Sequence, residues 1–320
     1  MGGVAARDPG FAASLRAQVR GEVREDEALA RYSTYRIGGP ATVLLPSSAE
    51  DVAVALRAAR QAGVPWFALG LGSNLLFPDS GLEALVIRLG KGLDRIQSSG
   101  ETWSLGAGLP GPLAARRTAE AGWAGLHKFV GVPGSVGGGV YMNAGCHGGE
   151  WAEVVTRVLV VDGAGQEQWR MRADVPFSYR SSGLDGMVVL ETDVTLRAEE
   201  KDRLADEVAE LFRWRQEGTP FNQPCCGSVF KNPGGPSWEH REGPRTAGQL
   251  IEAAGLKGSR IGGAEISPMH ANYFVNTGGA SAADVRGLIA LAQVRVQEQF
   301  GVLLETEVKL IGIRGEYLHA

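Results

Sequence analysis

The sequence has few cysteines, since only Cys146, Cys225 and Cys226 occur among its 320 residues. An odd count without paired spacing argues against a disulfide framework and against a zinc site. We therefore expect free thiols and no bound metal. The adjacent pair Cys225 and Cys226 leaves a redox role open beside the ordinary role of buried or loop thiols.

Long apolar runs and an excess of positive charge are also missing. No stretch approaches the ~18 apolar residues that a membrane helix requires, and a net charge of −4 with a pI near 5.8 indicates no basic face for nucleic acid. Residues 1–20 contain no continuous apolar core followed by a small-residue cleavage site, so we identify no signal peptide. These absences predict a cytoplasmic protein that binds neither membranes nor nucleic acid.

Apolar residues are abundant, at 44% of the chain, and there are 46 glycines. A chain of this length exceeds the usual size of a single core, so we expect two or three domains. Strands and helices are mixed without regular βαβ alternation, which favours an α+β fold over a doubly wound sheet.

Capping residues and periodicity predict several elements. Ser48 and Gly63 bracket one helix, and Ser281 with Asp284 begins another that ends at Gly301. A charged helix is expected over residues 199–215, before a passage rich in Pro, Gly and Asn. Strands are expected at residues 66–69, 85–89, 154–161, 168–171, 187–196 and 302–311. The first 25 residues show no caps and no sustained period, so they are expected to form an extension of uncertain order.

Two glycine clusters, at residues 70–74 and 131–139, would let backbone N–H groups approach a diphosphate. Ser73, Asn74 and Ser135 would add side-chain hydrogen bonds. Tight turns between strands need the same glycines, so one cluster alone leaves the two interpretations balanced. The two clusters together favour a dinucleotide.

Residues 106–111 also match the G-x-G-x-x-G pattern and precede a helix expected near Pro112. The acidic ribose ligand that should follow about 20 residues later is missing, because residues 127–139 contain no carboxylate. We therefore reject a Rossmann fingerprint here.

The most informative stretch is residues 227–233, where Ser228, Lys231 and Asn232 stand between a glycine and a proline. A turn in which Ser228 or Asn232 hydrogen-bonds nearby backbone would also explain these residue types. Other segments accompany this stretch in a fixed order. They are residues 34–41, 70–76, 132–138, 143–145, 177–182, 256–263 and 304–308. This ordered set, spanning about residues 25–315, resembles the UDP-N-acetylenolpyruvoylglucosamine reductase family.

The resemblance implies an α+β flavoenzyme with an FAD-binding domain of the vanillyl-alcohol-oxidase (PCMH) type. It implies an N-terminal extension (1–25), an FAD-binding domain (26–200) in two lobes (about 26–62 and 63–200), and a C-terminal α+β substrate-binding domain (201–320). Non-covalent FAD, NADPH as hydride donor and UDP-N-acetylglucosamine enolpyruvate as substrate are implied in the same way. The expected product, UDP-N-acetylmuramate, is a peptidoglycan precursor.

Site residues follow from the resemblance position by position. The implied flavin contacts are Tyr35, Arg36, Ile37, Gly38, Gly39, Gly70, Leu71, Gly72, Ser73, Asn74, Leu75, Val132, Pro133, Gly134, Ser135, Gly137, Gly138, Asn143 and Gly145. The implied catalytic residues are Arg180, Ser228 and Glu307. The implied substrate contacts are Lys231, Asn232 and His270.

The residue types suit these roles. Arg180 offers a permanently charged fork for a carboxylate and enolate, although a surface ion pair would also explain it. Ser228 would donate a proton to carbon, with Lys231 stabilising the alkoxide. Under a period of two, Glu307 shares a strand face with Leu303 and Glu305, which alone indicates solvent; only the resemblance makes it a catalytic acid or an anchor for Arg180.

Two departures from the family pattern stand out. Relatives commonly carry lysine where this chain has Gly218, and Arg213, Arg215 and Lys231 are the candidates to replace it. Relatives usually carry Ala-Tyr where this chain has Cys146 and His147, which puts any ring or hydroxyl contact to the flavin at that position in doubt. Between residues 196 and 199 there is no room for the tyrosine-bearing loop of some relatives, so the chain resembles the shorter subclass.

Two alternatives remain open at this point. One is another FAD-dependent oxidase of the same fold, and the other is a flavin- or nucleotide-sugar-binding module without catalysis. The oligomeric state and the preference for NADPH over NADH are open too, with a monomer expected.

Overall fold

The computed structural model describes residues 6–234 and 246–318. They form two compact units that interleave along the chain. The first unit takes its residues from 1–27, 41–71 and 83–215, and the second from 28–40, 72–82 and 216–320. The contiguous domain boundaries expected from the sequence stay a prediction.

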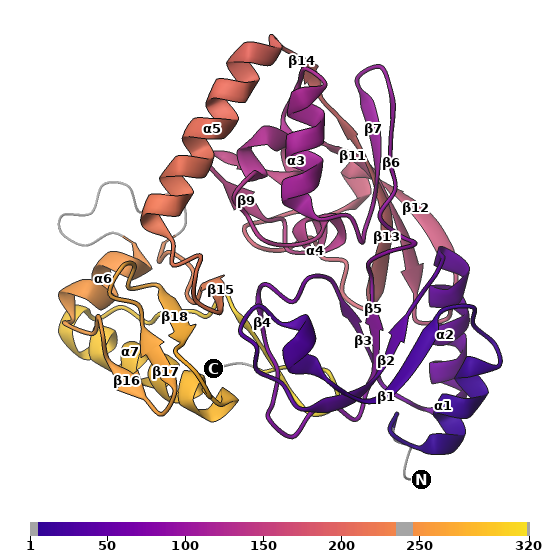
Figure 1. The fold of residues 1–320 in the computed structure, drawn as a ribbon, viewed down its shortest axis with the longest axis horizontal. Helices are drawn as coiled ribbons and strands as arrows, with labels where there is room; N and C mark the ends of the chain where they lie inside the picture. The colour runs from indigo at the N-terminus through magenta and orange to yellow at the C-terminus, as the bar shows by residue number, and fades with distance from the viewer. Residues whose placement is uncertain (1–5, 235–245, 319–320) are drawn as a thin grey trace. The chain divides into compact units, whose positions relative to one another are not determined.

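Two sheets form most of the described part of the first unit (Figure 1). One has the order β1-β2-β5-β3 and contains parallel neighbours; the other has the order β12-β11-β13-β7-β6 and is antiparallel. Their strands are β1 (Glu22–Ala28), β2 (Pro40–Leu45), β3 (Trp66–Leu69), β5 (Leu85–Arg88), β6 (Ile96–Ser99), β7 (Thr102–Gly106), β11 (Val155–Asp162), β12 (Glu167–Met171) and β13 (Met187–Thr195). This mixture confirms the α+β class.

The antiparallel sheet also settles the glycine pattern at residues 106–111. Strand β7 precedes helix α3 (Gly111–Glu120), but its sheet neighbours β6 and β13 run antiparallel to it. A Rossmann unit requires a parallel βαβ crossover, so the rejection of that fingerprint is confirmed.

The lobe boundary predicted at residue 62 falls within the span of the first sheet. This sheet takes β2 from before that boundary and β3 from after it.

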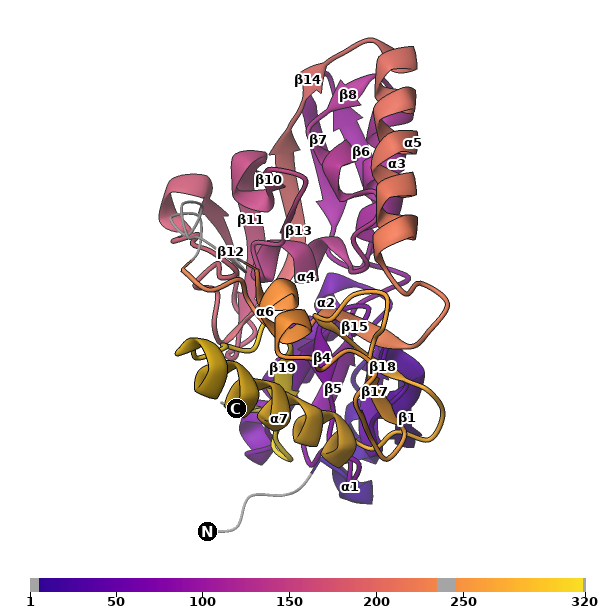
Figure 2. The ribbon, with the colours of Figure 1, turned by 90° about the vertical axis from the view of Figure 1, so that its left-hand side faces the viewer.

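Helices and short strands complete the first unit. Figure 2 shows α5 alongside α3, and buried Leu204 of α5 packs there with Ala119. The remaining elements are α1 (Pro9–Arg16), α2 (Ala49–Ala62), β8 (Trp123–Ala124), η2 (Leu126–Phe129), α4 (Val136–Tyr141), β9 (Gly145–Cys146), β10 (Gly149–Glu150), η3 (Trp151–Glu153), η4 (Arg172–Asp174), β14 (Arg197–Ala198) and α5 (Lys201–Gly218). Helix α5 runs three residues beyond the predicted end at residue 215.

Helix α2 forms where its capping signals predict. The Ser48 hydroxyl accepts a hydrogen bond from the Asp51 amide, and Gly63 ends the helix in the left-handed conformation at φ +68°. Val52 and Leu56 are fully buried in the core of the first unit. The predicted helix is confirmed at both ends.

Asp51 also ties α2 to the segment that precedes β1. Its carboxylate accepts hydrogen bonds from the Arg20 amide at 2.8 Å, from the Ser47 amide at 2.8 Å and from the Ser47 hydroxyl at 2.7 Å. Burial alone would raise the pKa of Asp51, but these hydrogen bonds to its charged form lower it on balance. The ionised carboxylate therefore stabilises the fold above its ordinary pKa, and that stabilisation is lost as the pH falls through the lowered value.

We expect Asp51→Asn to lower the free energy of unfolding by about 1.5–3 kcal/mol at neutral pH, because hydrogen bonds to a charged acceptor are lost. Urea denaturation at several pH values measures this. The difference should shrink as the pH approaches the lowered pKa. Glu50→Gln is the matched control, since Glu50 is exposed and within the described chain forms an ion pair with Arg57 alone; an equal loss in both variants would contradict the assignment.

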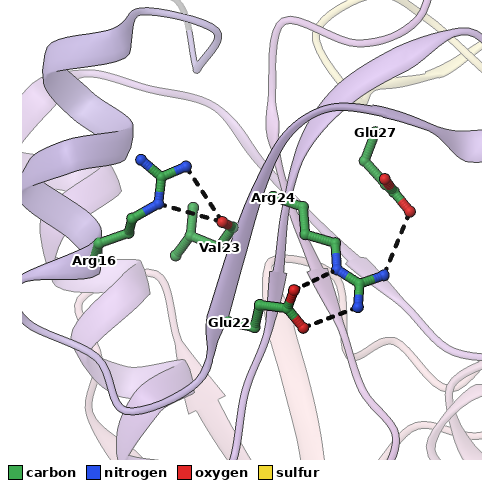
Figure 3. Close-up of polar contacts among 5 residues, drawn as sticks. All are labelled: Arg16, Glu22, Val23, Arg24 and Glu27. Carbon is green, nitrogen blue, oxygen red and sulfur yellow. Dashed lines mark hydrogen bonds and ion pairs between the residues drawn. The ribbon is translucent and has the colours of Figure 1, made fainter.

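The N-terminal segment differs from the sequence-based expectation. Asp8 caps α1 by accepting hydrogen bonds from the Gly10 and Phe11 amides, and Phe11 and Leu15 are buried. Arg16 donates through Nε and Nη2 to the Val23 carbonyl, both at 3.3 Å (Figure 3). The expectation of a capless extension is wrong for residues 6–25, while residues 1–5 lie outside the described residues.

The start of β1 carries a further ion pair cluster. Arg24 makes two hydrogen bonds to the Glu22 carboxylate, at 2.9 and 2.8 Å, and reaches Glu27 at 3.5 Å (Figure 3). The Arg24–Glu22 pair is exposed, and such pairs contribute little to stability. The burial of α1, rather than these charges, holds the segment.

The second unit contains two smaller sheets in its described part, ordered β15-β18-β17-β16 and β20-β19-β4. Helices α6 and α7 share one apolar core with the first of these sheets (Figure 1). The elements of the second unit are η1 (Leu29–Tyr32), β4 (Leu75–Leu76), β15 (Cys225–Ser228), α6 (Ala247–Ala253), β16 (Arg260–Ile261), β17 (Ala264–Ile266), β18 (Tyr273–Asn276), α7 (Ala282–Phe300), β19 (Lys309–Ile311) and β20 (Tyr317–Leu318).

Helix α7 confirms its predicted capping box and glycine stop. Ser281 and Asp284 cap each other's backbone amides, and Gly301 has φ +67°. The strand predicted over residues 302–311 is wrong in its first part, since only Lys309–Ile311 forms β19. Residues 305–308 instead hydrogen-bond the segment that follows β15, a pairing that spans about 75 residues of sequence.

Candidate active site

Arg180 lies at the tip of a tight turn in the first unit. Ser178 and Ser181 exchange backbone hydrogen bonds at 2.9 and 3.1 Å, and Arg180 between them has φ +57°. A turn with a positive φ at its third position is normally made by glycine, so arginine here costs about 1 kcal/mol. Its Nη2 donates to the Gly145 carbonyl at 3.3 Å, and its guanidinium lies 4.7 Å from the Tyr179 ring centre.

Asn143 holds this turn in place. It is fully buried, its Nδ2 donates to the Ser178 carbonyl at 2.9 Å, and its Oδ1 accepts from the Ala152 amide at 3.0 Å. Ser182 secures the other side by donating to the Tyr141 carbonyl at 2.8 Å. The side chain predicted to contact the flavin at residue 143 therefore serves the Arg180 turn.

Gly70 of the first glycine cluster meets Ser135 of the second cluster within the first unit. Gly70 has no room for a side chain, because a Cβ there would collide with the Ser135 Oγ. Ser135 is buried and accepts a hydrogen bond from the Gly138 amide at 3.2 Å. Among the described residues, the amides of Gly134 and Ser135 donate to no protein acceptor. The loops thus hold two backbone amides without a partner among the described residues, which fits a dinucleotide phosphate.

In the second unit, β15 presents Ser228. Gly227 precedes it with φ +79°, and Ser228 pairs with Tyr273 of β18 across an irregular register. The next residues leave the strand and pair elsewhere, because the Lys231 amide donates to the Glu305 carbonyl at 2.9 Å and Phe230 bridges Thr306. Residues 228–231 are therefore held by two partners distant in sequence, β18 and residues 305–306.

The same pairing places Glu307 beside the Ser228 segment. Its amide donates to the Val229 carbonyl at 2.8 Å, and the Asn74 Nδ2 donates to its carbonyl at 3.0 Å. Glu307 is half-buried, whereas Leu303 and Glu305 are exposed. The solvated strand face inferred from periodicity is wrong, because these residues do not form a regular strand.

Asn272 is a supporting residue that sequence reasoning missed. It is buried and binds Phe230 twice, with Oδ1 accepting from the amide at 2.9 Å and Nδ2 donating to the carbonyl at 2.8 Å. Its own amide donates to Nδ1 of His270 at 3.1 Å, and the His270 ring meets Tyr273 edge-on. Nothing in the local sequence signals this role, since the partner lies 42 residues away.

Lys231 and Asn232 lie beyond the strand. The Lys231 ammonium forms an ion pair with the exposed Glu305 carboxylate at 3.3 Å. Asn232 Oδ1 accepts from the Ala247 amide at 3.1 Å, which anchors the start of α6. The structure thus holds Glu307 beside the segment that contains Ser228, Lys231 and Asn232, because the Glu307 amide donates to the Val229 carbonyl.

Tyr35 lies in the core of the second unit. Its side chain is fully buried there, its amide donates to Ser33 and its carbonyl accepts from Asn276. Burial raises the pKa of the phenol well above its usual value, and the neighbouring Cys226 thiol adds to the shift. The contact of Tyr35 with the flavin stays a prediction.

Neither Cys225 nor Cys226 forms a disulfide, and Cys226 is buried. Burial raises the pKa of Cys226 well above its usual value, and the nearby Glu307 carboxylate adds to that shift. Such a thiol is chemically inert at neutral pH. Cys226 thus behaves as a core residue behind the Ser228 segment.

Positive φ values mark several of these positions. Of the five non-glycine residues with positive φ in the described chain, three are predicted site residues, namely Arg36, Asn143 and Arg180. Local strain of this kind gathers at functional sites, where the surroundings hold it in place. The remaining predicted residues divide between the units. Gly70, Leu71, Val132–Gly138 and Gly145 belong to the first, and Ile37–Gly39, Gly72–Leu75 and His270 to the second.

Comparison with known proteins identifies the family. A model of the FAD binding domain matches residues 40–169, and a model of the UDP-N-acetylenolpyruvoylglucosamine reductase C-terminal domain matches residues 219–311. A UDP-N-acetylenolpyruvoylglucosamine reductase from Halalkalibacterium halodurans is 43% identical over 305 residues, which cover 94% of this chain and 98% of that protein. The chain belongs to the UDP-N-acetylenolpyruvoylglucosamine reductase family.

Further members of the reductase family agree. The Bacillus subtilis protein of this name is 39% identical over 296 residues, covering 91% of this chain and 95% of its own. The crystal structure of the reductase from Thermus caldophilus has a TM-score of 0.77 at 35% identity and covers 91% of this chain and 99% of its own. The resemblance stated from sequence motifs and the FAD-binding domain are both confirmed. In the described chain no helix is both long and apolar enough to span a membrane.

Proposed function

We propose that the protein reduces UDP-N-acetylglucosamine enolpyruvate to UDP-N-acetylmuramate with NADPH, using bound FAD, and so supplies a peptidoglycan precursor. The observation that carries this proposal is the backbone pairing that holds Glu307 beside Ser228 and Val229 in a chain of this family. When bound, FAD supplies the redox chemistry by accepting a hydride from NADPH and passing it to the enolpyruvyl double bond.

The chain's own residues would bind, polarise and protonate the substrate. Arg180 is permanently charged, and its backbone is held in a tight turn. It would therefore bind the enolpyruvyl carboxylate and stabilise the negative charge of the enolate. Ser228 would donate the proton to the carbon that does not receive hydride. Glu307, held through its backbone by Val229 and Asn74, would fix the polar environment of that proton transfer.

The flavin would lie against the glycine loops. The close approach of Gly70 to Ser135 and the available amides of Gly134 and Ser135 support this assignment for the phosphates. Gly38, Gly39 and Gly72 are equally crowded, since a Cβ on Gly39 or Gly72 would collide with backbone. We also propose a monomeric, cytoplasmic enzyme that prefers NADPH over NADH.

We expect the FAD to be non-covalent, because the structure holds loop amides suited to phosphate while His127 is occupied elsewhere. His127 accepts from the Gly125 amide through Nδ1 and contacts Glu207 through Nε2 at 3.1 Å. Acid precipitation of the purified protein should leave FAD in a yellow supernatant. Flavin that stays on the pellet would show a covalent bond and contradict this expectation.

The reaction itself is tested by following NADPH consumption with and without the enolpyruvyl substrate. The proposal predicts consumption only with the substrate, and a product heavier than the substrate by two hydrogen atoms in mass spectrometry. UDP-N-acetylglucosamine, which lacks the double bond, is the matched control. Substrate-independent oxygen uptake with unchanged enolpyruvyl substrate would contradict the proposal and favour a flavin oxidase.

A further inference from the structure

A second arginine lies near the β9–β10 hairpin, whose Gly145 carbonyl accepts a hydrogen bond from Arg180. Arg215 lies in the last turns of α5, and its Nε donates to the Gly131 carbonyl at 3.2 Å. Its stem covers Gly131 so closely that a Cβ there would lie 2.6 Å from the Arg215 Cγ. Upstream, Glu207 and buried Leu204 tie α5 to the first unit. The guanidinium is therefore held by its stem and by one of its five donors.

The positive charge of Arg215 lowers the pKa values of Cys146 in strand β9 and of His147, the residue after it. Burial raises the pKa of Cys146, and the charges of Arg215 and Arg180 both oppose that rise. Burial lowers the pKa of His147, and the charge of Arg215 lowers it further. Both guanidinium groups thus lie near Cys146, within the same unit.

The remaining donors of Arg215 are available. Within the described residues, its Nη atoms donate to no protein acceptor. Of the other two candidates to replace the lysine absent at Gly218, Lys231 is engaged by Glu305, and Arg213 is exposed on α5. Among these three candidates, and within the part of the chain that the structure describes, Arg215 alone combines a fixed position with unused charged donors.

We propose that Arg215 binds the diphosphate of the nucleotide-sugar substrate while Arg180 binds its enolpyruvyl carboxylate. This inference rests on the proposed function. The substrate carries two anionic groups on one sugar, and two fixed guanidinium groups around one hairpin match that pattern. The FAD phosphates are assigned to Gly70 and the Gly134–Ser135 amides. Arg215 uses Nε for the Gly131 carbonyl at the start of that cluster, and its charge acts on Cys146, the residue after the Gly145 that Arg180 contacts.

Calorimetric titration of the FAD-loaded enzyme with UDP tests this directly, since UDP carries the diphosphate without the enolpyruvyl group. Arg215→Met keeps an unbranched stem over Gly131 but removes the charge. We expect its dissociation constant for UDP to rise about 10- to 100-fold, the effect of losing hydrogen bonds to a charged group. Arg203→Met removes the same charge from an exposed position on α5 and should change UDP affinity less than about twofold.

Gly131→Ala provides a second variant with the charge intact. Its Cβ would displace the Arg215 stem, so it should weaken UDP binding in the same direction. FAD content is measured in every variant. Unchanged UDP affinity in Arg215→Met would overturn the inference, and so would a loss of FAD that accounts for the weaker UDP binding. In both cases the wild type would still turn over its substrate, so the proposed function would stand. A wild type that neither binds UDP nor reduces the enolpyruvyl substrate would overturn the proposed function as well.

Discussion

Ser228→Ala should leave the reduction of the flavin by NADPH nearly unchanged but slow its reoxidation by the enolpyruvyl substrate by about 10²-fold or more, the usual contribution of a positioned proton donor. The substitution removes only the hydroxyl, and the backbone pairing of Ser228 with Tyr273 remains. Stopped-flow absorbance of each half-reaction under anaerobic conditions measures the effect.

Ser228→Cys and Cys225→Ala complete this test. A thiol can still donate a proton, so the cysteine variant should retain more activity than the alanine variant. Cys225 lies in the same strand and carries no proposed role, so its alanine variant should reoxidise at the wild-type rate. Near-normal reoxidation in Ser228→Ala would remove Ser228 from the mechanism.

Arg180→Lys should slow reoxidation by the enolpyruvyl substrate by about 10²-fold, because an ammonium keeps the charge but loses the planar fork that binds a carboxylate and the developing enolate. Flavin reduction by NADPH should change far less. Lysine meets the same backbone cost at φ +57° as arginine, so the thermal midpoint should stay unchanged.

Arg180→Gly separates the side chain from the turn. Glycine relieves the positive φ, so this variant should unfold at an equal or higher temperature while reducing the enolpyruvyl substrate even more slowly than Arg180→Lys. Tyr179→Phe keeps the ring beside Arg180 and is the neighbouring control. Equal losses in both half-reactions of Arg180→Lys would assign Arg180 to folding or flavin binding instead.

Local signals predicted the elements whose ends are set by local chemistry. Helices α2 and α7 begin at serine caps and end at glycines in the left-handed conformation, and the β11–β12 hairpin forms around Asp162, whose side chain accepts two turn amides. Helix α1 was missed although Asp8 and Pro9 are a recognisable cap and first helical residue. The signal was present there, but the helix is short.

Residues 302–308 and the site network were less predictable for a different reason. Their backbone groups pair with Val229 and Lys231, and a strand period cannot reveal partners so distant in sequence. The motifs identified Arg180, Ser228 and Glu307 as candidates, but not what holds them. Asn143, Asn74 and Asn272 do this through hydrogen bonds across 35 to 233 residues of sequence.

An anaerobic titration of the purified protein tests the central claim most directly. NADPH should bleach the flavin absorbance, and stoichiometric UDP-N-acetylglucosamine enolpyruvate should then restore it without oxygen. If the reduced flavin stays bleached with this substrate and is restored only by oxygen, the proposed reductase function is contradicted.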